Sequence, residues 1–356
     1  MSDGLPDAPS TDKVALVYPF PEPPQPGHRL QVAPGVHWIR MPLPYALNHI
    51  NLWQLDDGDG WALVDTGTRT EEVANAWRAL LEGELAPAPL TRVFVTHMHP
   101  DHVGMAGWMT RKFGVRLWMS RQEYLHCRVM VGDSSREAPA DGTAFYHRAG
   151  WSEASLETYR ARFGNFGKHI HALPDSYRRL VAGEEIAIGA HRWRVVVGHG
   201  HSPEHACLYC PELQLLISGD QVLPRISSNV SVYPLEPDAD PLADWLASIE
   251  RLLHEVPDDV LVLPSHGECF RGLHARLTAL ERGQHRALDR LRKRLAEPRR
   301  AIDVFGALFA RAVTEDNVGL LGMATGESVA CLNYLVQRGE ATWEDDAGGV
   351  RWYRMA

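Results

Sequence analysis

The chain has 356 residues, of which 45% are hydrophobic and 23% are charged, as in ordinary globular proteins. That length is sufficient for one large domain with a sizeable core and a small second domain. The formal net charge of −9 argues against nucleic acid or an anionic membrane as the main partner, because both favour basic surfaces. The sequence contains no apolar run that approaches the length of a membrane span.

The first residues and the cysteines predict a cytoplasmic protein. The opening MSDGLPDAPSTDK has neither the basic nor the apolar region of a secretory signal. The five cysteines lack the spacing of a disulfide scaffold, which fits a reducing compartment. Cys207 and Cys210 form a Cys-x-x-Cys, but residues three apart in the strand predicted there face opposite ways, so we expect a structural role for them.

Residues 1–29 include a proline-rich stretch at 21–27 and predict an extended leader. Runs of apolar, β-branched and aromatic residues then predict a β-meander whose turns are rich in aspartate and glycine. Its strands are expected at 36–41, 49–55 and 61–64. The last of these strands ends at Asp65, and a helix is expected at 70–82 because apolar residues recur there at helical spacing.

Three histidines and one aspartate occupy the seven residues 96–102, between a buried strand predicted at 92–95 and a helix predicted at 102–113. The chain has 18 histidines, so some clustering by chance is expected. A His-x-His-x-Asp-His cluster directly after an apolar strand is nevertheless typical of a metal site. It lies on a strand-to-helix turn.

The spacing within this cluster predicts two metal ions. His97 and His99 are two apart in near-extended backbone and can point to the same side. Asp101 and His102, at the start of the helix, would return toward the same point from the other side. Two converging pairs indicate two ions instead of one, and the remaining ligands must come from elsewhere in the chain.

The residues that follow predict a helical insertion and a second β-rich half. A strand is expected at 115–119, and residues 121–180 have helical periodicity and many aromatic side chains. Those aromatics would form either a lid or pocket wall, or the insertion's own small core. Further strands are expected at 185–188, 193–197, 206–209, 213–217 and 260–263, with a helix at 241–255. Two β-rich halves flanked by helices predict an α/β fold, a four-layer α/β/β/α sandwich with its site where loops of both halves meet.

Residues 282–356 predict a small winged-helix-like domain. Helical segments reach to about residue 337, and a hairpin is expected at 342–352 around Gly348-Gly349. Winged helices often bind DNA, but the wing here carries an acidic run from Glu344 to Asp346, which repels phosphates. We therefore expect a structural or dimerising module that also covers one edge of the site, and a homodimer is possible.

Further candidate ligands follow other predicted strands. His201 lies in the loop after one apolar strand, Asp220 ends a second and His266 ends a third. Asp65 ends an earlier one. Each is a polar residue at a strand end, which is where a layered fold exposes side chains to a shared cleft.

The ordered motifs resemble those of the metallo-β-lactamase-fold hydrolases, especially the glyoxalase II (hydroxyacylglutathione hydrolase) branch with a C-terminal winged-helix-like domain. The resemblance covers about residues 30–280 and implies a hydrolase domain at 30–281. The motifs are Asp65-Thr-Gly, Thr96-His-Met-His-Pro-Asp-His102, His201-Ser-Pro-Glu-His205, Ser218-Gly-Asp220 and His266-Gly267. Glu204 and Ser265 stand where the family more often has glycine, which removes no ligand.

The resemblance implies a role for each of these polar positions. Asp65 would orient the ligand loop from outside the metal shell, and His199 and His205 would be neighbours of the ligands. Asp101 and Asp220 would be catalytic together with a hydroxide that bridges the ions. The implied ligands are His97, His99 and His201 for the first ion, Asp101, His102 and His266 for the second, and Asp220 for both.

Imidazole and carboxylate ligands without thiolate suit two zinc ions, and also admit iron or manganese. The expected function is hydrolysis of a small-molecule thioester or ester, of the acyl-CoA or acyl-glutathione type, by attack of the bridging hydroxide. A lactonase and a nuclease or phosphodiesterase of the same superfamily are the alternatives. Substrate contacts are expected from Arg225, Ser227, Asn229 and Tyr233, although Arg225 could instead pair with a nearby aspartate.

Overall fold

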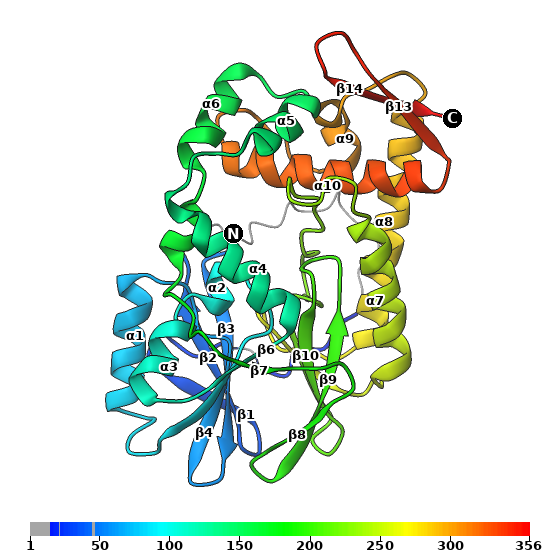
Figure 1. The fold of residues 1–356 in the computed structure, drawn as a ribbon. Coiled ribbons are helices and arrows are strands. Elements are labelled where there is room, and N and C mark those ends of the chain that lie inside the picture. Colours follow the sequence, from blue (N-terminus) through cyan, green and yellow to red (C-terminus); the bar gives the residue numbers. More distant parts are fainter. Residues whose placement is uncertain (1–14, 21, 45–46) are drawn as a thin grey trace.

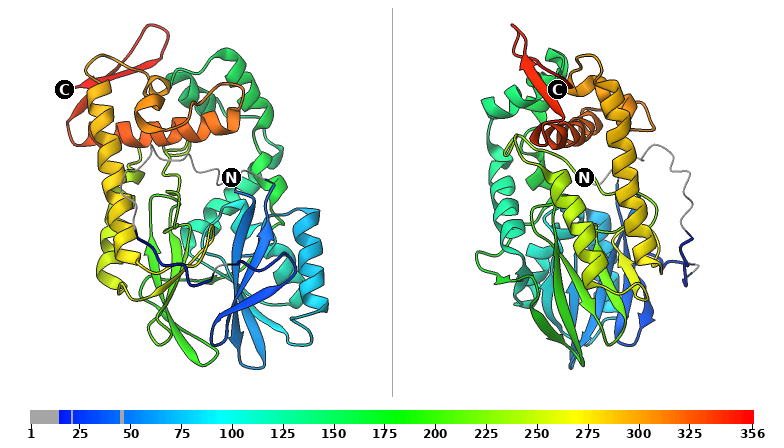
Figure 2. Two further views of the ribbon diagram at one scale, coloured as in Figure 1. Left: turned by 180° about the vertical axis from the view of Figure 1, so that it is seen from behind. Right: turned by 90° about the vertical axis from the view of Figure 1, so that its right-hand side faces the viewer.

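The computed structural model describes residues 15–20, 22–44 and 47–356. Two β-sheets face each other and helices cover the outer face of each, so the layers run helix, sheet, sheet, helix (Figure 1). The two further views in Figure 2 show the same stacking, with a group of helices and a hairpin beyond one end of the sandwich. The predicted four-layer α/β sandwich is confirmed.

The first sheet has seven strands in sequence order. Its first four strands pair antiparallel, and from β4 onward the pairing is parallel. The strands are β1 (Arg29–Ala33), β2 (Val36–Pro42), β3 (His49–Asp57), β4 (Gly60–Val64), β5 (Leu90–Phe94), β6 (Leu117–Met119) and β7 (Arg178–Arg179). The short β7 closes the predicted insertion by returning the chain to this sheet.

The second sheet has five strands in the order β12-β11-β10-β9-β8. All neighbours are antiparallel except β11 and β12, which are parallel. The strands are β8 (Glu185–Ile188), β9 (His191–Gly198), β10 (His205–Cys210), β11 (Leu215–Gly219) and β12 (Leu261–Pro264). Parallel pairing in both sheets brings several strand ends to a common edge. The candidate ligands lie in the loops that follow these strand ends.

Three apolar cores correspond to the three layer boundaries. The core between the sheets contains Trp38, Trp53 and Trp193, and two others lie between each sheet and its helices. Cys207 belongs to an outer core and Cys210 to the core between the sheets. The two thiols therefore face opposite ways, as period-two alternation in a strand requires, and no disulfide joins any of the five cysteines, all of which lie in the described part of the chain.

The helices of the first layer follow from their sequence. Helix α1 (Glu71–Glu82) begins where the Thr70 side chain accepts the amide of Val73, and its buried residues recur at helical spacing. The single helix predicted at 102–113 is wrong, because the structure has α2 (Pro100–Val103) and α3 (Ala106–Phe113). Between them the Met105 amide lies 3.0 Å from the carbonyl oxygen of Gly67, so the chain turns toward that loop.

The insertion consists mainly of α4 (Arg121–Gly132), α5 (Ala140–Arg148) and α6 (Glu153–Arg162), followed by a short 3-10 helix at Asn165–His169. Its buried aromatics do not form a separate core. Phe145 and Trp151 belong to the cluster that includes the C-terminal helices, and the Trp151 indole N–H donates to Thr325 Oγ1 at 2.9 Å.

The chain ends in long helices and a hairpin: α7 (Pro241–Glu255), α8 (Leu273–Arg294), α9 (Phe305–Leu308), α10 (Val318–Gln337), β13 (Ala341–Asp345) and β14 (Arg351–Met355). The domain boundary expected at 282 lies inside α8, which runs from the sandwich to the C-terminal helices, where α10 crosses it (Figures 1 and 2). None of the helices in the described part of the chain combines the length and apolar character of a membrane crossing.

Candidate metal centre

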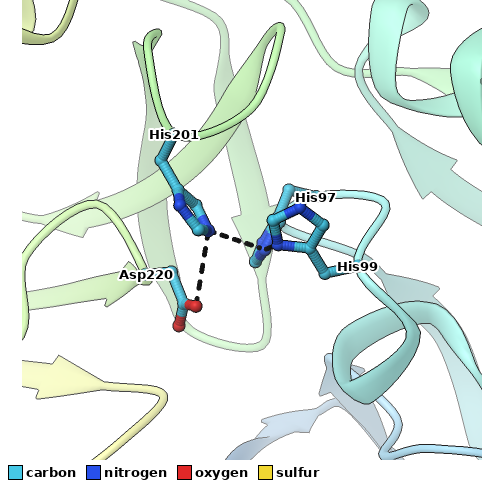
Figure 3. A group of neighbouring side chains, drawn as sticks. All are labelled: His97, His99, His201 and Asp220. Atoms are coloured by element: carbon cyan, nitrogen blue, oxygen red, sulfur yellow. Dashed lines mark hydrogen bonds and ion pairs between the residues drawn. The ribbon is translucent and has the colours of Figure 1, made fainter. Parts of the chain in front are cut away.

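The loops after four strands, β5, β9, β11 and β12, converge at one edge of the sandwich and bring the predicted ligands into two groups. The first group contains His97, His99, His201 and Asp220, whose ligand-type atoms lie within 4.8 Å of one another. Figure 3 shows the ring of His201 between the His97–His99 pair and the Asp220 carboxylate. His201 Nε2 lies 3.3 Å from His97 Nε2 and 3.4 Å from Asp220 Oδ2.

The second group contains Asp101, His102 and His266. Its carboxylate oxygen, Asp101 Oδ2, lies 3.3 Å from His266 Nε2 and 3.7 Å from His102 Nε2. Asp220 connects the groups, because its other oxygen, Oδ1, lies 3.4 Å from His102 Nε2 and 3.5 Å from His266 Nε2. The structure thus brings together all seven residues that the sequence predicted as ligands.

The chemistry of these residues fits divalent cations. Burial and the neighbouring imidazoles hold the pKa of His97 and His99 well below the ordinary value, so both rings are neutral, the form that binds a metal. Burial alone would raise the pKa of Asp220, but the facing rings of His266 and His102 outweigh it and hold that pKa well below its usual range.

Two buried atoms of the ligand groups have no hydrogen-bond partner. Within the described part of the chain, His102 Nε2 and Asp220 Oδ1 make no hydrogen bond, and buried polar atoms rarely remain unsatisfied. These two atoms lie 3.4 Å apart, one in each group. Seven nitrogen and oxygen donors without thiolate fit zinc, iron or manganese.

Three of the imidazoles are oriented through Nδ1. His102 donates to Asp65 Oδ2, His201 to the carbonyl oxygen of Asn229 and His266 to that of His49, at 2.8, 2.7 and 2.8 Å. Each bond fixes the tautomer and turns Nε2 toward the cluster, as is usual around protein-bound metals. Asp65 also accepts the Thr96 amide at 2.8 Å, so it orients the motif loop as well as one ring.

Two further histidines, beside the ligand loops, support the backbone. His205 Nε2 accepts the amide of Asp220 at 3.1 Å, and His199 Nδ1 donates to the carbonyl oxygen of Pro203 at 2.7 Å. Gly219 has φ +53°, and a Cβ there would lie 2.4 Å from His205 Nε2. Glycine is therefore required for the backbone to present Asp220 to the cluster.

Glu123 is a buried residue that motif reasoning missed. Its Oε2 accepts the amide of Met98, between His97 and His99, at 2.9 Å, and its Oε1 accepts the amide of Glu204 at 2.7 Å. The Glu204 side chain in turn accepts the amide of Gln122, at the start of α4, at 2.8 Å. The first turn of the insertion thus joins the two loops that carry the histidines of the first group.

A small cavity opens beside the first group. Three of the four expected substrate contacts, Ser227, Asn229 and Tyr233, line it. Arg225 does not line it and forms a two-bond ion pair with Glu268, at 2.8 and 3.0 Å, so it pairs with a glutamate instead of the expected aspartate. The other lining residues are Leu47, His99, His201, Asp220, Leu223, Ile226 and Ser228.

A four-layer sandwich with clustered histidines and aspartates at its loop edge is the architecture of a metallohydrolase. The sequence profile of the metallo-beta-lactamase superfamily matches residues 47–266, and that of the metallo-beta-lactamase-like C-terminal domain matches residues 288–356. The chain belongs to the metallo-beta-lactamase superfamily and is a metal-dependent hydrolase.

Solved structures resemble nearly the whole chain. A beta-lactamase domain protein from Burkholderia ambifaria is 40% identical with a TM-score of 0.87, and the match covers 96% of this chain and 98% of that one. A metallo-beta-lactamase family protein from Thermus thermophilus is 25% identical with a TM-score of 0.77, covering 92% of this chain and 100% of that one.

Two curated relatives are named as thioesterases. An acyl-coenzyme A thioesterase from Gallus gallus is 25% identical over 66% of this chain and 79% of that protein. An atrochrysone carboxyl ACP thioesterase from Aspergillus fumigatus is 24% identical over 72% of this chain and 47% of that protein.

Proposed function

We propose that this protein is a binuclear hydrolase that cleaves a small-molecule thioester. The observation that carries the proposal is the position of Asp220, whose Oδ2 faces His201 while its Oδ1 faces His102 and His266. A carboxylate with one oxygen toward each of two ligand groups is suited to bridge two cations. The ions would be held by His97, His99 and His201 on one side and by Asp101, His102 and His266 on the other.

Two divalent ions bound there, zinc foremost, would lower the pKa of a water molecule toward neutrality and polarise a carbonyl oxygen. The chain's own residues supply orientation and enclosure. The rings of His102, His201 and His266 are held in place by the oxygen atoms that accept hydrogen bonds from their Nδ1 atoms. Burial of the site excludes bulk water and strengthens the electrostatic interactions within it.

The cavity lining favours an acyl group over a phosphate. Leu47, Leu223 and Ile226 give it an apolar side, and Ser227 and Asn229 give it hydrogen-bonding groups. Neither lysine nor arginine is among its described lining residues, whereas phosphate sites usually present cationic side chains. This composition supports a thioester or ester substrate and speaks against a nuclease or phosphodiesterase.

A thioester fits better than an oxygen ester because of its leaving group. A thiol has an ordinary pKa of about 8.5 and leaves as a thiolate without a general acid. The cavity's described lining offers no carboxylic acid or imidazole outside the two ligand groups. The two curated thioesterase relatives support the same class, with acyl-CoA and acyl-glutathione as the thiol carriers to test, and a lactone as the nearest alternative substrate.

The test is a substrate panel of acyl-CoA, acyl-glutathione, simple esters and lactones, assayed with protein that has been stripped and reloaded with zinc, iron or manganese. We expect metal-dependent release of free thiol that is lost in His99→Ala. The matched control is His285→Ala, an exposed histidine on α8, which should retain the activity. Thioester cleavage that is equal in wild type and His99→Ala, or absent with every metal, would contradict the proposal.

A further inference from the structure

Residues 227–232 form an irregular segment that is buried although it belongs to no helix or strand. We call residues 227–233 the cavity loop, because Ser227, Ser228, Asn229 and Tyr233 line the cavity. A buried segment without secondary structure must find partners for its backbone groups elsewhere. Its partners lie on the C-terminal helix α10 and in the metal centre.

Helix α10 forms hydrogen bonds with the cavity loop. The Val232 amide donates to the carbonyl oxygen of Gly326 at 3.0 Å, and the Asn229 side-chain amide donates to Glu327 Oε2 at 2.8 Å. The Ser231 hydroxyl lies 3.4 Å from the carbonyl oxygen of Met323. One face of α10 therefore fixes both the backbone and the side chains of the loop.

The same loop reaches the predicted ligands from its other side. The Asn229 carbonyl oxygen accepts His201 Nδ1 at 2.7 Å, and the Ser228 hydroxyl donates to the carbonyl oxygen of Asp220. Asn229 thus binds Glu327 through its side chain and His201 through its backbone. A displacement of the loop would change the cavity wall and the direction of the His201 ring together.

We propose that α10 is a working part of the active site, in which Gly326 and Glu327 are positioning residues that set the shape of the acyl cavity and the orientation of His201. The acyl-cavity part of this inference rests on the proposed thioesterase function, whereas the part that concerns His201 does not. The C-terminal region then determines which acyl groups the site accepts, in addition to packing on the sandwich.

Gly326 makes this inference testable. A Cβ at this position would lie 2.8 Å from the carbonyl oxygen of Val232 and 2.9 Å from the Ser231 side chain, so the loop would have to move. Gly322 lies one turn earlier on the same helix, and a Cβ there would meet only Trp151 and Tyr146, each at 3.9 Å. Gly326→Ala and Gly322→Ala thus make the same chemical change. Gly326→Ala forces the cavity loop to move, whereas Gly322→Ala does not.

The first experiment compares these variants in kcat and KM across a series of acyl chain lengths. We expect Gly322→Ala to behave as wild type. We expect Gly326→Ala to lose about tenfold to a hundredfold in kcat/KM, with the loss unequal along the acyl series because the cavity wall has moved. Equal kcat/KM values for both variants across the whole series would overturn the proposal.

The second experiment reads the metal centre without substrate, in protein loaded with Co²⁺, whose visible spectrum responds to ligand geometry. We expect Gly326→Ala and Glu327→Ala to shift this spectrum, and Gly322→Ala and Glu327→Gln to leave it unchanged, since glutamine can still accept from Asn229. Glu327→Ala carries the test if Gly326→Ala does not fold. Unchanged spectra in both would overturn the His201 part, whereas a wild type inactive on every thioester would contradict only the proposed function.

Discussion

The Oδ2 atom of Asp65 lies 2.8 Å from Nδ1 of His102, and both side chains are buried. Asp65 has φ +61°, in the left-handed region, which asparagine also adopts readily. The Asp65→Asn variant should therefore keep the backbone while losing the negative charge that supports the His102 ring. We expect metal affinity or activity to fall about 10- to 100-fold, measured by chelator competition and by kcat/KM.

The matched control for this variant is Asp59→Asn, an exposed residue in the β3–β4 turn. It should leave metal affinity unchanged. If Asp65→Asn binds metal as tightly as the control does, Asp65 does not support the centre through His102.

Glu123 joins the two loops that carry the histidines of the first ligand group, through two backbone amides. Glu123→Gln replaces one accepting oxygen by an NH₂ group, which would face a backbone N–H instead of accepting it. Such a mismatch costs about 1–3 kcal/mol, so we expect a lower thermal midpoint together with weaker metal binding. Calorimetry and metal titration of Glu123→Gln, with the exposed Glu137→Gln as control, separate the two effects. A lower midpoint with unchanged metal affinity would assign Glu123 to fold stability alone.

The candidate ligands could be predicted from the sequence because metal binding requires particular side chains at strand ends. His97 and His99 follow an apolar strand at period-two spacing, and the sheets bring Asp220 and His266 to the same edge. Most of the strands were predictable from their apolar runs, but β1 and β7 were not predicted. The residue types alone therefore indicate the chemistry of the site.

The features that escaped prediction depend on contacts between residues that are distant in the sequence. Glu123 is recognised only through the amides of Met98 and Glu204, which leave no pattern in the sequence. The break between α2 and α3 depends on a contact from Met105 to Gly67. The placement of Arg225 outside the cavity depends on Glu268, 43 positions away, and such pairings require the folded chain.

Removal of the metal should lower stability, because ions that bind only the native state stabilise it by mass action. Free metal at about 100 times its dissociation constant contributes about 2.7 kcal/mol. We expect a chelator to lower the thermal midpoint of wild type, and zinc to restore it. Asp220→Ala, which lacks the carboxylate facing both groups, should show a smaller zinc-dependent rise. A midpoint independent of metal in wild type would contradict the assignment of these residues as ligands.

Asp57 joins the two sheets through charged hydrogen bonds. Arg92 donates to both of its oxygens, at 2.7 and 2.8 Å, and the amide of Gly189, in the turn between β8 and β9, donates at 2.9 Å. Burial alone would raise the pKa of this carboxyl. The hydrogen bonds from Arg92, Thr91 and Gly189 outweigh the effect of burial, so the pKa of Asp57 is lowered. The charged form is thus favoured in the native state.

A lowered native pKa fixes the direction of the pH effect on stability. The contribution of Asp57 is fully present above the pKa of an unfolded aspartate, about 3.9, and is lost as the pH falls through the lower native value. Asp57→Asn should therefore be less stable than wild type by about 1–2 kcal/mol near neutrality, and the difference should narrow below about pH 4. Urea unfolding at a series of pH values measures this. A difference that stays constant down to pH values well below 4 would mean that the interaction does not depend on the charge of Asp57.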